Sequence, residues 1–143
     1  MPRSILLLGV ACLSCNAFWG VARAETVPFS ATMAGASEVP PKTTAGAGTA
    51  TATLDTTTKM LTYDVEYSGL SGPATAAHFH GPAEPGANAG VVMPFSAPAT
   101  PIKGTATLTD AQMSDLMAGK WYANVHTAAN PAGEIRGQLT RAK

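Results

Sequence analysis

The feature that most constrains the fold is a two-residue alternation of apolar and polar side chains, which recurs in short runs along the chain. The clearest run spans residues 61–67 and reads Leu61, Thr62, Tyr63, Asp64, Val65, Glu66, Tyr67. Successive side chains of a β-strand point to opposite faces of a sheet, so this run places one face against a core and the other in water. The pattern predicts an all-β domain.

The spacing of these runs indicates the number of strands. We expect about eight, near residues 27–33, 48–54, 61–67, 75–80, 90–95, 102–108, 121–125 and 133–139. Glycine, proline, aspartate and asparagine separate the runs, as they do in the turns of β-domains. Many short strands joined by such turns predict a β-sandwich or a β-barrel.

One segment breaks the alternation and predicts a short helix near residues 110–118. Thr109 and Gln112 have the spacing of a capping box, in which each side chain bonds the backbone N–H of the other residue. Gly119 suits the C-terminal cap. Three apolar residues share one face at helical spacing: Met113, Leu116 and Met117. We expect this helix to close one end of the core, with its methionines as core residues rather than metal ligands.

The first 24 residues have the pattern of a secretory signal peptide. Arg3 precedes a nearly continuous apolar run at residues 5–21, and the sequence ARA at 22–24 is a small-x-small cleavage pattern. We therefore expect export, to the periplasm of a Gram-negative bacterium. A membrane anchor and a lipoprotein modified at Cys12 or Cys15 are weaker alternatives, because the run is short and interrupted and neither cysteine follows a lipobox.

The remaining residues, 25–143, have the size and composition of one exported domain. Both cysteines precede residue 25, so the fold depends on its own core, or on a bound metal, rather than on a disulfide. Of nine Lys and Arg residues two precede residue 25, which leaves seven against nine Asp and Glu and a net charge of −2. Such a domain lacks a basic footprint, so we expect neither nucleic acid nor, after cleavage, a membrane as partner.

All three histidines lie in two segments that are rich in glycine and proline. His78 and His80 lie in AAHFHGP, and His126 lies in NVHTAANPAGEIRGQL. Residues i and i+2 of a strand share a face, so His78 and His80 project side by side. If the strand that carries Tyr122 and Asn124 meets theirs, His126 completes a three-nitrogen metal site. The alternative is that the histidines are ordinary surface or hydrogen-bonded residues, since short motifs give false matches.

Three imidazoles suit zinc, copper, iron or nickel, and they leave an open coordination position that is typical of a reactive centre. Glu84, Asn88 or Glu134 could supply a fourth ligand, although a solvated carboxylate, a turn residue and a strand charge explain them more simply. Arg136 shares a strand face with Glu134. It either attracts a small anion toward the metal, a catalytic role, or pairs with Glu134.

Four segments of the chain carry a family resemblance: FSATMAGASEVPP, GTATATLDTTTKMLTYDVEYSGL, HFHGPA and NVHTAANPAGEIRGQL. Together they resemble the CHRD, or chordin-type, domain family over nearly all of residues 29–139. The resemblance implies an immunoglobulin-like, Greek-key β-sandwich in an exported bacterial protein. In animal chordins such domains occur as repeats that bind growth factors, which implies a non-catalytic binding module as one function.

The histidine pattern also resembles the copper site of Cu/Zn superoxide dismutase, a protein that shares the sandwich architecture. The zinc-loop ligands, the loop disulfide and the fourth histidine of that enzyme are missing, so the similarity is one of site type. It implies an iron or copper ion that dismutates superoxide, with Arg136 drawing the anion in, whereas zinc would not cycle. A periplasmic metal storage or delivery protein is a further alternative. An exposed sheet edge also permits a homodimer.

Overall fold

The computed structural model describes residues 25–143, so the expected signal peptide at residues 1–24 lies outside the described part of the chain. No helix among the described residues is long and apolar enough to cross a membrane. The elements in chain order are β1 (Thr26–Ala34), η1 (Gly35–Ser37), β2 (Ala47–Asp55), β3 (Met60–Ser68), β4 (Ala74–His80), β5 (Val91–Pro94), β6 (Ile102–Thr107), α1 (Asp110–Met117), β7 (Tyr122–Thr127), β8 (Ile135–Gln138) and β9 (Thr140–Arg141).

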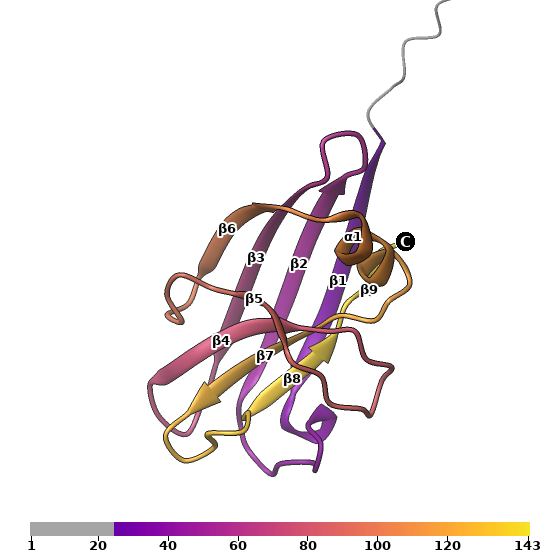
Figure 1. Ribbon diagram of the computed structural model, residues 1–143. Coiled ribbons are helices and arrows are strands. Elements are labelled where there is room, and N and C mark those ends of the chain that lie inside the picture. The colour runs from indigo at the N-terminus through magenta and orange to yellow at the C-terminus, as the bar shows by residue number, and fades with distance from the viewer. Residues whose placement is uncertain (1–24) are drawn as a thin grey trace, which may run out of the picture.

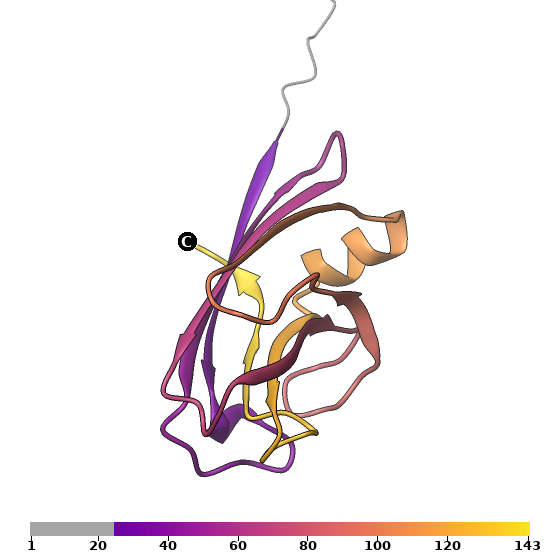
Figure 2. The ribbon, with the colours of Figure 1, turned by 90° about the vertical axis from the view of Figure 1, so that its left-hand side faces the viewer.

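The strands form one antiparallel sheet that curls into a half-barrel (Figures 1 and 2). Its order is β5-β4-β7-β8-β1-β2-β3-β6, and β9 pairs separately with β1. The long strands β1, β2 and β3 are paired over all nine residues of each strand. In Figure 2 these three strands form one side of the molecule, and β4, β5 and β7 form the other.

The two sides enclose a single apolar core. The Tyr63 ring of β3 meets the Phe79 ring of β4 edge to face, with 5.4 Å between ring centroids, and Phe95 packs against both rings. Burial of such aromatic and aliphatic surface is the main stabilising contribution to a domain without disulfides. The side chains that are fully buried in this core include Phe29, Met33, Leu54, Leu61, Val65, Phe79, Trp121, Ile135 and Leu139.

The halves of the sheet are joined where β8 meets β1. The β1–β8 pairing is short, with Ala34 opposite Arg136, and β9 continues the contact at Phe29 and Ser30. The all-β prediction with one short helix is thus confirmed, in the form of one continuous curled sheet. The strand boundaries agree within a few residues, but β7 continues to Thr127, so His126 lies inside this strand rather than beyond its end.

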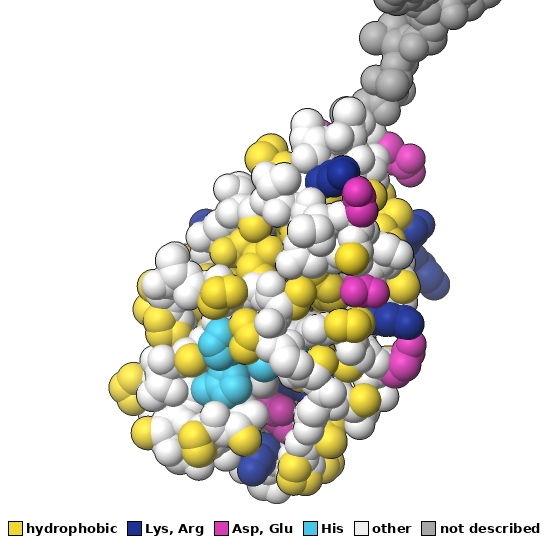
Figure 3. Space-filling model, viewed as in Figure 1, with side chains coloured by type: hydrophobic (Ala, Val, Ile, Leu, Met, Phe, Trp, Pro, Cys, Tyr) yellow, Lys and Arg dark blue, Asp and Glu magenta, His cyan; other side chains and the backbone are white. Residues whose placement is uncertain are grey.

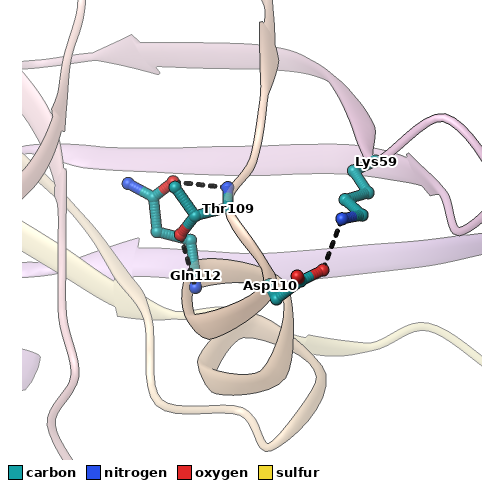
Figure 4. A network of polar contacts seen from close by, with 4 residues as sticks. All are labelled: Lys59, Thr109, Asp110 and Gln112. Atoms are coloured by element: carbon teal, nitrogen blue, oxygen red, sulfur yellow. Dashed lines mark hydrogen bonds and ion pairs between the residues drawn. The ribbon is translucent and has the colours of Figure 1, made fainter.

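The helix α1 forms as its sequence predicts. The Thr109 side chain accepts a hydrogen bond from the Gln112 backbone N–H at 3.2 Å, and the Gln112 side chain accepts one from the Thr109 N–H at 2.9 Å (Figure 4). Asp110 in the first turn pairs with Lys59 at 2.5 Å, and Gly119 follows the last turn at a φ of +74°. Leu116 is fully buried, so α1 covers one end of the core.

Candidate metal centre

Three adjacent strands, β4, β7 and β8, bring the site residues onto one face of the sheet. In the β4–β7 pairing His80 lies opposite Tyr122 and His78 lies opposite Asn124, while His126 lies opposite Ala76. Directly opposed residues of an antiparallel pair point to the same face, so all three histidines share the face that turns away from the core. Figure 3 shows the histidine side chains together at the surface of this face.

The ring nitrogens of the three histidines converge. One nitrogen from each ring lies within 4.8 Å of the other two, and among the described residues these are the group that could hold a metal ion. His78 Nδ1 lies 3.3 Å from His126 Nε2. Two metal–nitrogen bonds of about 2.1 Å can span at most about 4.2 Å, so the rings need only a small rotation to close on one ion.

Backbone carbonyls fix which nitrogen is free in two of the rings. His80 Nδ1 lies 3.0 Å from the Ala89 carbonyl oxygen, and His126 Nδ1 lies 3.0 Å from that of Pro131. A carbonyl oxygen only accepts, so each Nδ1 must donate its hydrogen, and in the neutral ring Nε2 carries the lone pair. His80 Nε2 is buried and has no hydrogen-bond partner among the residues that the structure describes. Metal-binding histidines commonly have this arrangement.

The surroundings also favour the neutral, metal-binding form of the rings. Burial lowers the pKa of His78 below its ordinary value, and the nearby His126 and His80 rings lower it further. Burial likewise lowers the pKa of His80, and the charge of Arg136 adds to the effect, although the hydrogen bond to Ala89 acts in the opposite direction. Uncharged imidazoles present lone pairs without competition from protons, as metal binding requires.

Arg136 lies beside the histidines but does not contact them. Its side chain is only 2% exposed. Its Nη1 donates to Asn88 Oδ1 at 2.9 Å and its Nη2 donates to the Ala87 carbonyl, rather than to Glu134. Its guanidinium lies 3.4 Å from the centroid of the Tyr122 ring, in a cation–π contact. The structure therefore places the Tyr122 ring between Arg136 and the histidine cluster.

The three residues considered as fourth ligands have other contacts. Glu84 is exposed and lies 3.6 Å from Lys120 Nζ. Asn88 accepts a hydrogen bond from Arg136 and donates one to the Val39 carbonyl at 3.2 Å. Glu134 is fully buried. Its carboxylate accepts hydrogen bonds from the Thr44 hydroxyl, the Ser71 hydroxyl and N–H, and the Thr127 hydroxyl.

The Glu134 carboxylate holds three loops together. Burial alone would raise its pKa, but the hydrogen bonds from Ser71, Thr127 and Thr44 outweigh this effect and lower the pKa to about 2. Thr127 is the neighbour of His126, so the network fixes the end of β7 from which His126 projects. The role of Glu134 in the structure is thus to stabilise the turn between β7 and β8.

Sequence reasoning did not assign a role to Tyr122, Asn124 or Glu38, although it placed the first two on the face of His126. Asn124 is buried and donates to Glu38 Oε1 at 2.5 Å and to the Ile135 carbonyl at 2.9 Å. Burial raises the pKa of Glu38. The alternation of Tyr122 and Asn124 with His126 was the available sequence signal for these two residues, whereas Glu38 is remote in sequence.

Gly133 shows how closely these groups pack. Its φ is +125°, a backbone conformation that residues other than glycine rarely adopt. A Cβ added at this position would lie 2.5 Å from Glu38 Oε1 and 2.7 Å from Asn124 Nδ2. Arg136 and Gln138 line a cleft of about 500 Å³ together with residues of the segments 36–41 and 85–86. Only a glycine at 133 therefore allows the loop after β7 to close over Asn124.

Comparison with known proteins gives one match. A family model described as the CHRD domain matches residues 29–139, a segment that contains all three histidines, Tyr122 and Arg136. No curated protein and no solved structure gives a significant match.

Proposed function

The chain belongs to the CHRD domain family, and we propose that it binds one transition-metal ion through His78, His80 and His126. The observation that carries this proposal is that His80 and His126 each donate Nδ1–H to a backbone carbonyl. The Nε2 lone pairs of both rings then face His78, whose Nδ1–H donates to that of His126 in the metal-free protein. The unpartnered, buried Nε2 of His80 supports it, because a buried polar atom without a partner is costly unless a ligand satisfies it. The protein would thus use Nε2 of two rings and, once the His78 proton shifts from Nδ1 to Nε2, Nδ1 of the third.

We further propose that the ion is iron or copper and that the protein dismutates superoxide. With either ion bound, the centre would supply the one-electron chemistry that converts two superoxide anions and two protons into dioxygen and hydrogen peroxide. The chain contributes three ligands, which leave a position for a small anion, and the part of the histidine cluster that reaches the surface gives that anion access (Figure 3). Zinc at the same residues would bind without redox turnover.

Arg136 would contribute its charge from behind the Tyr122 ring. A guanidinium is positive at any working pH, so it favours an anion near the histidines without touching it. Glu38 lies close enough to Arg136 for the two charges to interact, and this reduces the net positive potential. We therefore expect Arg136 to aid attraction of the anion modestly, and the ligands to set the activity.

Elemental analysis and spin resonance of untagged, freshly isolated protein, followed by a superoxide assay of the iron-loaded and copper-loaded forms, test the proposal. One iron or copper ion per chain together with dismutation would support both parts. Tight binding without turnover would favour metal storage or delivery, and a folded protein that binds no transition metal would leave a CHRD binding module.

The setting of the site completes the proposal. We propose that residues 1–24 direct the protein to the periplasm and are then removed.

We also propose that the curled sheet is a continuous variant of an immunoglobulin-like, Greek-key sandwich. The facing strands β3 and β4 support this fold, because they meet across one core as the two sheets of a sandwich do. The edge strands β5 and β6 end the sheet, and pairing of either edge would produce the homodimer considered from sequence.

A further inference from the structure

The Tyr122 side chain is buried between two charged or chargeable groups of neighbouring strands. Its ring stacks on the His80 ring of β4 with the planes 2° apart and the centroids 4.9 Å apart. On its β8 side the ring contacts the Arg136 guanidinium, 3.4 Å from the ring centroid. Because β7 lies between β4 and β8 in the sheet, Tyr122 separates the two groups.

The phenol of Tyr122 bonds the backbone of Ala89, whose carbonyl also orients His80. Its hydroxyl accepts a hydrogen bond from the Ala89 N–H at 3.1 Å and donates one to the Ala89 carbonyl at 3.2 Å. The same carbonyl accepts the Nδ1–H of His80 at 3.0 Å. One backbone group therefore links the tyrosine hydroxyl to the histidine tautomer.

The loop that contains Ala89 depends on this face of the sheet for its position. Ala87, Asn88 and Ala89 form consecutive contacts: the first two accept hydrogen bonds from Arg136, and the third bonds Tyr122. All three loop residues lie outside the strands, and Ala87 and Asn88 are exposed. Without the Tyr122 hydroxyl, the Ala89 carbonyl would keep the His80 ring as its hydrogen-bond partner among the described residues, while the next carbonyl, that of Gly90, would still accept from the Gly81 N–H at 3.1 Å.

We propose that Tyr122 is a positioning residue for His80, which it orients both by ring stacking and by holding the Ala89 carbonyl where it fixes the Nδ1–H tautomer. The inference rests on the proposed metal-binding function, because its purpose is to aim Nε2 of His80 at the shared ion. Tyr122 itself contributes no ligand atom. Partners that orient a metal-binding histidine in this way typically change metal affinity by tenfold to a hundredfold when removed.

The variant Tyr122→Phe tests this role because it keeps the stacked ring and removes only the hydroxyl. Tyr67→Phe is the matched control: the Tyr67 hydroxyl also donates to a loop carbonyl, that of Pro98 at 2.6 Å, on a strand remote from the histidines. Nitrogen NMR of the imidazoles in the metal-free proteins reports the tautomer of His80, and Zn²⁺ competition with a chelator reports affinity.

We expect a single Nδ1–H tautomer at His80 in the wild type, a mixture of tautomers in Tyr122→Phe, and Zn²⁺ binding that is about tenfold weaker in that variant. Tyr67→Phe should match the wild type in both measurements. An Nε2–H tautomer in the wild type, or a Tyr122→Phe protein with unchanged tautomer and affinity, would overturn the inference. If the wild type bound neither Zn²⁺ nor copper or iron, the proposed function would fall, and the tautomer would still decide the role of Tyr122.

Discussion

The sheet has two outward faces, one on β2-β3-β6 and one on β4-β7-β8. Both carry alternating polar residues in the sequence, but the first is exposed to solvent and the second is largely buried. The first face presents threonines and charged residues to solvent, with Thr51 and Thr62 exposed and Lys103 paired with the partly exposed Asp64. The second face contains polar residues as well, yet Tyr122, Asn124, Glu134 and Arg136 are nearly or fully buried. Polarity in a strand therefore does not by itself indicate an exposed face.

The loops account for the difference. Residues 87–89 and the segment around Glu38 bond directly to Arg136, Tyr122 and Asn124. On the β2-β3-β6 face, no loop among the described residues hydrogen-bonds the side chains of Thr51, Thr62 or Lys103, and Lys103 bonds Asp64 of the neighbouring strand. Covering polar strands is favourable only when every buried group finds a partner, and on this face the partners are loop carbonyls and side chains. Within residues 25–143 these loops supply no hydrogen-bond partner for His80 Nε2, and the ion is proposed to bind at this atom.

Replacing a histidine of the covered face should have the largest effect. We expect His126→Gln to lose more metal affinity than the tenfold to hundredfold typical of a residue that only orients a ligand, because it removes one of three ligands. Thr51→Ala on the solvent face should leave affinity unchanged. Isothermal titration with Zn²⁺ measures both, and equal affinities in the two variants would contradict the contrast between the faces.

Glu134→Gln should cause the next largest change, a loss of folding stability of about 2–3 kcal/mol, because the carboxylate accepts four hydrogen bonds in a buried site. Asp64→Asn, on the solvent face, should cost much less. Urea unfolding at neutral pH measures both changes. Similar losses in the two variants would show that the covering loops add nothing at Glu134.

The same residue predicts an acid dependence. The folded-state pKa of Glu134 is about 2, below its ordinary value of 4.5, so the carboxylate stabilises the fold fully above about pH 4.5. This contribution, about 3 kcal/mol from the size of the shift, is lost as the pH falls from about 4.5 toward 2. Glu134→Gln should lack this part of the pH dependence, and parallel wild-type and variant curves in that range would contradict the assignment.

Substitution of two glycines with positive φ separates two contributions to the loss of folding stability, steric clash under the loops and backbone strain. An added Cβ at Gly133 would meet Glu38 and Asn124, whereas one at Gly86, with a φ of +83°, would have nothing within 4 Å. We expect Gly133→Ala to cost about 2–4 kcal/mol and Gly86→Ala about 1 kcal/mol. Thermal unfolding measures both, and equal losses would mean that strain alone matters.

The smallest effect should come from the solvent face. Lys103 pairs with Asp64, but the lysine side chain is 63% exposed, and water and salt screen such a pair. Lys103→Ala should shift the urea midpoint little, and any shift should vanish in high salt. A large, salt-independent loss would show that this face is organised like the covered one.

The strands and the helix could be predicted from the sequence because alternation and capping are local. His78 and His80 could be placed on one face for the same reason, and the convergence of His126 followed from a strand pairing that the structure shows. The burial of Arg136 and the contact between Glu38 and Asn124 could not be predicted. They depend on loops that join positions 48 and 86 residues apart, for which alternation gives no register.

The central claim is that three imidazoles from two strands bind one ion. X-ray absorption of the protein loaded with one equivalent of copper or iron tests it most directly, because imidazole rings give a distinct multiple-scattering signal. The account predicts three imidazole nitrogens per ion in the wild type and two in His126→Gln. Fewer than three in the wild type, or the same number in both proteins, would contradict it.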